Sequence, residues 1–115
     1  MSQISDLTFL RTFTSGDAAK ISKYVNMFLK AAPASLTDME VQAANGDWKS
    51  LKTNAHSLKS QLKYMGVASG EVVAQEIERC AGDQTDLEAI PGKIGTLSQI
   101  TLAACEELKG ELAKL

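Results

Sequence analysis

The sequence predicts an all-α protein, an antiparallel four-helix bundle with a short additional helix at its N-terminus. Apolar residues recur at spacings of three and four, rather than two, along almost the whole chain. Two prolines and eight glycines are the only strong interruptions, and the turns that they mark are short. Short turns favour packing of the helices within one chain over a coiled coil between chains. We therefore expect residues 1–115 to form a single domain.

The N-terminal part of the chain predicts a short helix and then a long one. The short helix covers about residues 6–14. It is followed by Ser15-Gly16-Asp17, a break and an N-cap, because an aspartate side chain can accept hydrogen bonds from the free N–H groups that begin a helix. The long helix continues through Pro33 with a bend, since one apolar stripe runs across the proline. This stripe consists of Ile21, Val25, Phe28, Ala32, Leu36, Met39 and Ala43.

The next helix is predicted over about residues 47–65, between two turns that contain glycine. Its start is marked by Asn45-Gly46-Asp47, which stops the preceding helix and supplies a new N-cap. Gly66 and Gly70 bracket the turn at its other end. Its apolar stripe consists of Trp48, Leu51, Ala55, Leu58, Leu62 and Met65.

Two further helices complete the predicted bundle. The first is shorter and ends near Gly82. Its apolar stripe consists of Val73, Ile77 and Cys80 or Ala81. Asp86 opens the last helix, which continues almost to the C-terminus despite Pro91 and Gly92 early in it. The last stripe consists of Leu87, Ile90, Ile94, Leu97, Thr101, Ala104 and Leu108.

The composition excludes two classes of partner. Twelve Lys and Arg residues against fourteen Asp and Glu residues give a net charge of −2, so no overall positive field attracts nucleic acid or an anionic membrane. No segment approaches the roughly 20 apolar residues of a membrane span, and the N-terminus lacks a secretory signal. Cys80 and Cys105 lack the spacing of a metal site or disulfide scaffold, which indicates buried thiols in a reducing compartment. We expect a cytoplasmic protein with no nucleic-acid and no membrane partner.

The single histidine lies on the outer face of its predicted helix. At about 100° per residue, His56 points away from the apolar stripe, and four lysines lie within roughly 60° of its direction. These are Lys49, Lys52, Lys59 and Lys63. One interpretation is an ordinary solvated face on which the histidine has no role. The other is a phosphoryl acceptor, because neutral imidazole is nucleophilic near pH 7 and a bound phosphoryl group needs cations beside it.

The residues around this histidine match a known pattern. The helix contains the run Ala55-His56-Ser57-Leu58-Lys59-Ser60 and is followed by Gly66. This run resembles the signature of histidine phosphotransfer (HPt) domains, Ala-His-x-Leu-Lys-Gly with a second glycine ten residues after the histidine. The resemblance continues upstream through Phe28-Leu29, Pro33 and Gly46-Asp47-Trp48, and it covers about residues 18–82.

The resemblance implies a role for several residues. His56 would be the phosphoryl acceptor, and Lys59, one turn further on, would neutralise the phosphoryl oxygens. Lys52, Lys63 and Ser60 would give further support to the site. Gly66 has a structural interpretation, since glycine ends a helix in a conformation that is costly for other residues.

The resemblance also implies a phosphocarrier rather than an enzyme. Its partners would be response-regulator receiver domains and a sensor histidine kinase, and we expect a monomer. No cofactor of its own and no metal ligand set are expected, because one histidine without Glu-x-x-His pairs supplies too few ligands. Mg²⁺ would come on the receiver domain. The chain lacks a glycine-rich phosphate loop, so we expect no autokinase activity with ATP.

Two positions depart from the family pattern and leave an alternative open. Ser60 stands where the family has glycine, and Gln61 replaces a small residue next to it. Serine narrows access to the histidine, and Gln61 lies on the flank that faces a neighbouring helix. The alternative is a non-catalytic interaction module that docks receiver or kinase domains without being phosphorylated.

We assign no functional site to the tryptophan, the tyrosines or the apolar residues near the N-terminus. Trp48, Tyr24 and Tyr64 occur at helical spacing, which is typical of core or rim positions. The N-terminal apolar residues either cap the bundle or form a docking patch beside His56. These are Ile4, Leu7 and Leu10.

Overall fold

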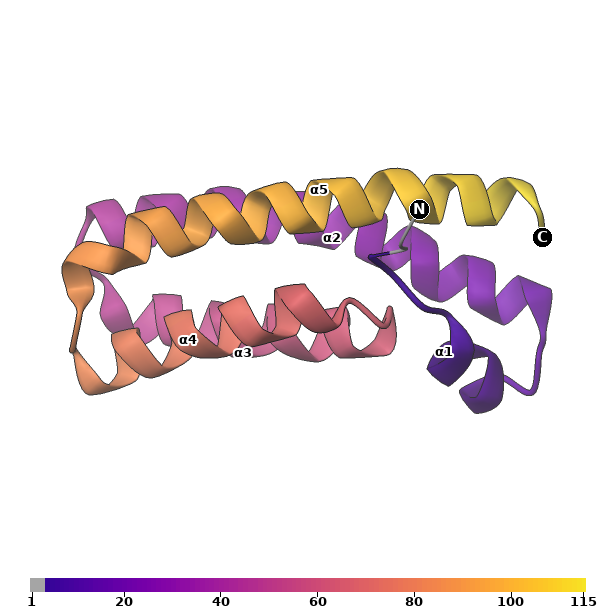
Figure 1. The fold of residues 1–115 in the computed structure, drawn as a ribbon, viewed down its shortest axis with the longest axis horizontal. Helices are drawn as coiled ribbons and strands as arrows, with labels where there is room; N and C mark the ends of the chain where they lie inside the picture. The colour runs from indigo at the N-terminus through magenta and orange to yellow at the C-terminus, as the bar shows by residue number, and fades with distance from the viewer. Residues whose placement is uncertain (1–3) are drawn as a thin grey trace.

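The structure of the chain, a computed structural model, describes residues 4–115. It consists of five α-helices and one short 3₁₀ helix, and these residues form no strand. The α-helices are α1 (Thr8–Phe13), α2 (Ala18–Ala44), α3 (Trp48–Tyr64), α4 (Ala68–Asp83) and α5 (Ile90–Ala113), and the 3₁₀ helix spans Leu87–Ala89. The prediction of an all-α bundle with a short N-terminal helix is confirmed (Figure 1).

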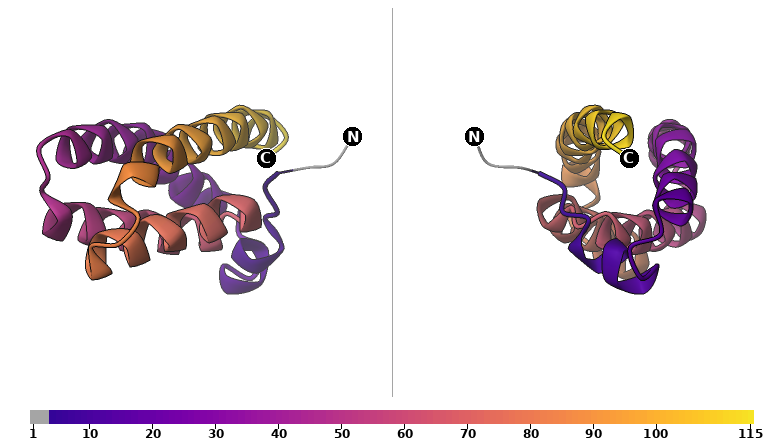
Figure 2. Two further views of the ribbon diagram at one scale, coloured as in Figure 1. Left: turned by 60° about the vertical axis from the view of Figure 1, so that its left-hand side comes forward. Right: turned by 90° about the vertical axis from the view of Figure 1, so that its right-hand side faces the viewer.

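Helices α2 to α5 form the bundle. Each packs against its neighbours in the order α2, α3, α4, α5, and α5 closes the ring on α2. The layer of α2 and α5 lies over the layer of α3 and α4 (Figure 1). Because α2 and α5 have 27 and 24 residues and α3 and α4 only 17 and 16, the first pair overhangs the second by about 10–15 Å at 1.5 Å per residue. Helix α1 lies under this overhang, at the end of the bundle (Figures 1 and 2).

The apolar stripes form the core between the two layers. Most of the stripe residues named above are buried, and the partly buried ones pack against the core. The partly buried members are Ala43, Trp48, Val73 and Leu87. Cys80 and Cys105 are buried free thiols, as expected. At about 25 cal/mol per Å² of apolar surface, burial of these stripes is the main source of stability and fixes the rotation of every helix about its axis.

The N-caps predicted at the starts of α2 and α3 are confirmed. The Asp17 carboxylate accepts a hydrogen bond from the Lys20 amide at 3.1 Å, and the Asp47 carboxylate accepts one from the Ser50 amide at 3.3 Å. Helix α2 continues through Pro33 as a single helix. Each cap satisfies one of the free N–H groups at a helix start, which contributes about 1 kcal/mol.

Two predicted boundaries are wrong. Gly70 does not border a turn; it is buried inside α4, where an added Cβ would lie 3.2 Å from Val67 and 3.3 Å from Leu62. Its lack of a side chain lets α4 approach α3 closely. Asp86 does not cap the last helix: it adopts a positive φ of 51° and makes no cap bond. Helix α5 begins later, with Pro91 in its first turn, where a missing N–H costs little.

Gly66 is one of the residues at which the N-terminal segment touches the bundle. It follows α3 with φ +67°, and an added Cβ would lie 2.7 Å from the Asp6 amide nitrogen. The Asp6 amide donates to the carbonyl of Met65 at 3.0 Å. Glycine is therefore required here both by the left-handed backbone and by the close approach of a second chain segment.

We expect Gly66→Ala to destabilise the fold far more than Gly46→Ala. Gly46 has a similar φ of +69° but open space around the position of a Cβ, so it isolates the backbone cost of about 1 kcal/mol. Gly66→Ala adds an overlap with the Asp6 backbone and should lower the free energy of unfolding by about 3 kcal/mol or more. Urea unfolding of both variants measures the difference. Equal losses would contradict the packing of Asp6 on Gly66.

Candidate functional site

The packing of α3 against α4 determines where His56 stands. On α3, Ala55 and Leu58 are fully buried against the core. His56 is turned about 100° from Ala55 and about 160° from Leu58, so it points outward. The side chain of His56 is 62% exposed. The imidazole is therefore open to a large partner molecule, as the helical periodicity predicted.

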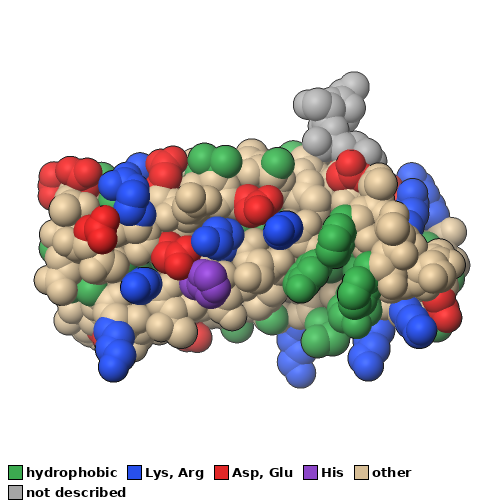
Figure 3. All heavy atoms as spheres, turned by 90° about the horizontal axis from the view of Figure 1, so that it is seen from below, with side chains coloured by type: hydrophobic (Ala, Val, Ile, Leu, Met, Phe, Trp, Pro, Cys, Tyr) green, Lys and Arg blue, Asp and Glu red, His purple; other side chains and the backbone are tan. Residues whose placement is uncertain are grey.

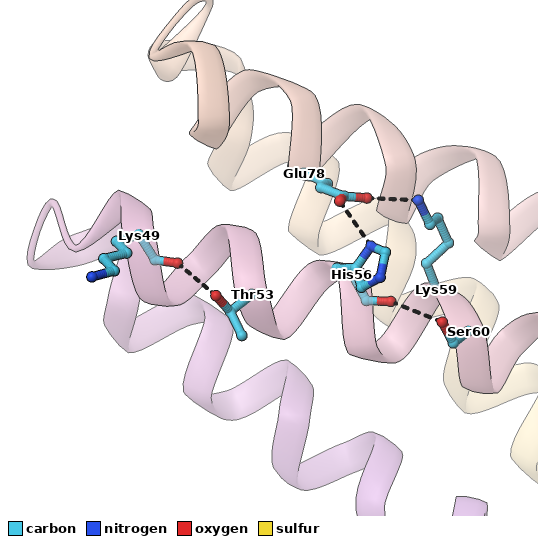
Figure 4. Close-up of polar contacts among 6 residues, drawn as sticks. All are labelled: Lys49, Thr53, His56, Lys59, Ser60 and Glu78. Atoms are coloured by element: carbon cyan, nitrogen blue, oxygen red, sulfur yellow. Dashed lines mark hydrogen bonds and ion pairs between the residues drawn. The ribbon is translucent and has the colours of Figure 1, made fainter.

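Glu78 of α4 contacts both His56 and Lys59. Its Oε2 lies 2.9 Å from His56 Nδ1, and its Oε1 accepts a hydrogen bond from Lys59 Nζ at 2.7 Å (Figure 4). Partial burial raises the pKa of Glu78, but the hydrogen bonds from Lys59 and His56 outweigh it and leave the pKa below its ordinary value. The carboxylate is thus ionised at neutral pH and can only accept hydrogen bonds.

This contact determines the tautomer of the ring. Because the Glu78 carboxylate can only accept, Nδ1 of His56 must carry the proton that joins them. In the neutral imidazole, Nε2 then holds the free lone pair. The geometry therefore presents an exposed imidazole whose Nε2 can act as a nucleophile and whose Nδ1–H is held by a carboxylate.

The lysines near His56 do not form one uniform row. Lys59 is only 24% exposed and is paired with Glu78, whereas the sequence interpretation placed it in solvent. The aliphatic chain of Lys52 leans over Gly82 of α4, where an added Cβ would lie 3.2 Å from Cδ and Cε. Lys52 and Lys59 therefore border the groove between α3 and α4, which has a volume of about 330 Å³.

Lys49 and Lys63 remain exposed on α3. Neither takes part in an ion pair with an acidic side chain of residues 4–115. Figure 4 shows Lys49 well away from the imidazole, on the first turns of the helix. Both lysines contribute positive charge to this face at long range. Salt screens this long-range effect more strongly than it screens a direct ion pair.

Ser60 and Gln61, the two residues that depart from the family pattern, have side chains in different environments. The Ser60 hydroxyl donates to the carbonyl of His56 at 3.4 Å, so it is directed to the helix backbone and not to the ring (Figure 4). Gln61 is half-buried beside α2 and lines an apolar cavity of about 550 Å³ between α2 and α3. Its Oε1 is buried and has no hydrogen-bond partner among the described residues.

Four aromatic rings form an exposed cluster near the end of α3, which we call the aromatic patch. Phe9 stacks on Phe13 at 6.2 Å and lies 5.4 Å from Tyr64, and Phe13 meets Tyr24 edge-on at 5.9 Å. A hydrophobic cluster and the histidine lie on one face of the molecule (Figure 3). An exposed apolar patch of this kind is a candidate interaction surface.

Sequence reasoning missed most of this surface. Tyr24 and Tyr64 were interpreted as core or rim, but both are exposed members of the patch. Leu7 and Leu10 are buried and cap the bundle, so the docking alternative for them is wrong. The signal that could have revealed the patch is the pair Phe9 and Phe13, which lie four residues apart and therefore on one face of α1.

Glu78 was also missed, and only the structure reveals it. It is one of several acidic residues on α4, and the register between α3 and α4 decides which of them meets His56. Among residues 4–115, no group of three or more His, Cys, Asp or Glu side chains has the geometry of a metal site. None of the helices described by the structure carries an apolar stretch long enough to cross a bilayer.

Comparisons with known proteins identify relatives of the chain. A protein-family model described as "Hpt domain" matches residues 23–115. The crystal structure of histidine-containing phosphotransfer protein B (HptB) from Pseudomonas aeruginosa PAO1 has a similar fold. The TM-score is 0.89, the match covers 100% of this chain and 99% of that chain, and the sequence identity is 18%. No match to the chain was found among curated protein sequences.

We expect Glu78→Gln to lower the free energy of unfolding by about 1 kcal/mol at neutral pH, because it removes the charge that His56 and Lys59 share. The folded-state pKa of Glu78 lies below 4.5, so the unfolded chain takes up the proton first as the pH falls. The carboxylate therefore stabilises the fold above pH 4.5 and loses this effect as the pH drops through the lower folded pKa.

Urea unfolding of the unmutated protein and Glu78→Gln from neutral pH down to about pH 3 measures this effect. The difference in unfolding free energy should shrink as the solution becomes more acidic. Glu106→Gln is the matched control, since Glu106 is 75% exposed and pairs only with a neighbour on its own helix. A difference that stays constant across the pH range would show that the Glu78 charge does not stabilise the site.

Proposed function

This chain belongs to the Hpt domain family, and we propose that it accepts a phosphoryl group on His56 from the phospho-aspartate of a receiver domain, or from a kinase, and passes it to another receiver. The observation that carries this proposal is the exposed imidazole whose Nδ1–H is held by Glu78, which leaves the Nε2 lone pair free. We expect Nε2 to be the atom that is phosphorylated.

The transfer step requires only two things of this chain: a nucleophile and a positive charge that compensates the phosphoryl oxygens. Nε2 of His56 attacks the phosphorus in line, the N–P bond forms, and the P–O bond to the receiver aspartate breaks, so that the aspartate leaves as a carboxylate. The ring gains positive charge as the new bond forms. The Glu78 carboxylate, 2.9 Å from Nδ1, offsets that charge, and the return step reverses the same movements.

Lys59 supplies the cation for the phosphoryl oxygens. In the resting protein its ammonium group is bound to Glu78 at 2.7 Å. A phosphoryl group on Nε2 brings negative charge next to the same site, and a lysine side chain can rotate towards it while its backbone stays fixed. Lys52 borders the same groove and adds a second positive charge, and Lys63 contributes only at longer range. Ser60 and Gly66 have no direct part, because the first bonds the backbone and the second shapes the turn.

The aromatic patch is the surface on which we expect the receiver domain to dock. A receiver whose aspartate reaches Nε2 must cover the face around His56, and the patch lies on that face (Figure 3). Covering four partly exposed rings supplies hydrophobic binding energy, while the catalytic Mg²⁺ comes on the receiver. The chain itself would act as a monomeric, cytoplasmic phosphocarrier with no cofactor and no autokinase activity.

Phosphoryl transfer from a receiver domain tests this function. A receiver charged with radioactive phosphate should pass its label to the unmutated protein as an acid-labile, alkali-stable phosphoramidate. His56→Gln should receive none, because no other imidazole is present in the chain. If the unmutated protein binds several receivers but never takes up label, the non-catalytic interaction module is the correct function instead.

We expect Lys59→Ala to slow the transfer by about tenfold to a hundredfold, since it removes the cation nearest the phosphoryl group. The loss of unfolding free energy should stay below about 1 kcal/mol, because a single partly exposed ion pair contributes little. Lys63→Ala is the matched control: it removes an exposed lysine of the same helix without an ion pair. Rapid-quench measurements of single turnovers compare the two, and equal rates would remove Lys59 from the mechanism.

A further inference from the structure

Residues 4–7 form a non-helical segment ahead of α1, which we call the strap. One end of the strap is bound by Glu107 of α5. The Glu107 carboxylate accepts hydrogen bonds from the Ile4 amide at 2.9 and 3.0 Å, from the Ser5 amide at 3.0 Å and from the Ser5 hydroxyl at 2.9 Å. One side chain thus holds two consecutive amides that lie more than a hundred positions away in the sequence.

The other end of the strap is bound at the end of α3. The Asp6 amide donates to the Met65 carbonyl at 3.0 Å, and the Asp6 carboxylate accepts from the Thr8 amide at 2.9 Å and from the Thr8 hydroxyl at 2.6 Å. The strap therefore spans the end of the bundle from α5 to α3 and continues directly into α1 (Figure 2). Leu7 and Leu10 follow it into the core.

Helix α1 depends on this attachment for its position. It has only six residues, which is too short for a helix that is stable by itself. Yet it supplies half of the aromatic patch, with Phe9 against Tyr64 and Phe13 against Tyr24. If the strap detaches, the two tyrosines of α2 and α3 remain in place and the two phenylalanines do not.

We propose that Glu107 is a positioning residue for partner docking: by anchoring the strap it holds α1 where Phe9 and Phe13 complete the aromatic patch. The proposal rests on the proposed function, because that function makes the patch the docking surface of the receiver domain. Glu107 itself is on α5 and is no part of the chemistry at His56.

A carboxylate is the group that fits this role. All the strap groups that meet Glu107 are donors, and two ionised oxygens can accept from each of them. Partial burial raises the pKa of Glu107, but the hydrogen bonds from Ser5 and Ile4 outweigh it, so the pKa lies below its ordinary value and the group is charged at neutral pH. A glutamine of the same shape would lose the charge and place an NH₂ donor where Oε2 now accepts from the Ile4 amide at 2.9 Å, so that two donors would face each other.

The experiment compares Glu107→Gln with Glu106→Gln in transfer from a phosphorylated receiver domain. We expect Glu107→Gln to raise the KM for the receiver about tenfold, with kcat unchanged, because it weakens docking and leaves His56 intact. The reaction of His56 with phosphoramidate, a small donor that needs no docking, should keep its rate. Glu106→Gln removes the same charge from the neighbouring exposed position and should change none of these values.

Two further variants test whether the increase in KM arises from the aromatic patch and the strap. Phe13→Ala should raise the KM by itself, and combining it with Glu107→Gln should add little, because both act through the same surface. Ser5→Ala removes one donor and keeps both strap amides, so it should give a smaller increase than Glu107→Gln. Hydrogen exchange should be faster at the amides of residues 4–6 in Glu107→Gln and unchanged in the bundle core.

Several results would overturn the proposal. An unchanged KM in Glu107→Gln would do so, and so would full additivity with Phe13→Ala. A fall in kcat together with a slower phosphoramidate reaction would indicate general damage instead of positioning. If the unmutated protein accepts phosphate from receivers and Glu107→Gln behaves identically, only this inference fails. If the unmutated protein accepts none, the proposed function fails and the inference fails with it.

Discussion

In the proposed transfer, the chemistry depends on the Glu78 carboxylate, which is shared between His56 and Lys59. It joins two helices, determines that Nδ1 carries the proton of the neutral ring, and binds the Lys59 ammonium group with its other oxygen. None of this requires a cavity or a bound cofactor in the chain. It requires only that α3 and α4 keep their register, and the close packing of these helices, with Gly70 buried between them, maintains it.

Under the proposed function, the unequal helix lengths separate the site of chemistry from the docking surface. His56 lies where all four bundle helices are present, so its helix is firmly held by the core. The aromatic patch lies next to the overhang of α2 and α5, where α1 fills the space that α3 and α4 leave (Figure 1). In the proposed mechanism, a rigid site for chemistry and an adjacent surface assembled from a separately anchored helix would let a partner be recognised without altering the nucleophile.

The sequence was sufficient to predict the elements and the face on which His56 lies, because both follow from the period of apolar residues. The stripe through Leu51, Leu58 and Leu62 determines which side of α3 is buried, and His56 follows from it by direction alone. Contacts between elements were not predictable in this way. Glu78 meets His56 only through the register of α4 on α3, and the Glu107 contact joins opposite ends of the chain. Gly70 was misread because a glycine required for helix packing and a glycine that ends a helix look alike in sequence.

The most direct test of this account is the protonation and phosphorylation pattern of the His56 ring, read by ¹⁵N NMR of the imidazole nitrogens before and after the protein is phosphorylated. We predict that a resting ring with a single proton carries it on Nδ1, and that the phosphoryl group is on Nε2 afterwards. A singly protonated resting ring with its proton on Nε2, or a phosphoryl group attached to Nδ1, would contradict the claim that Glu78 selects the nucleophilic nitrogen.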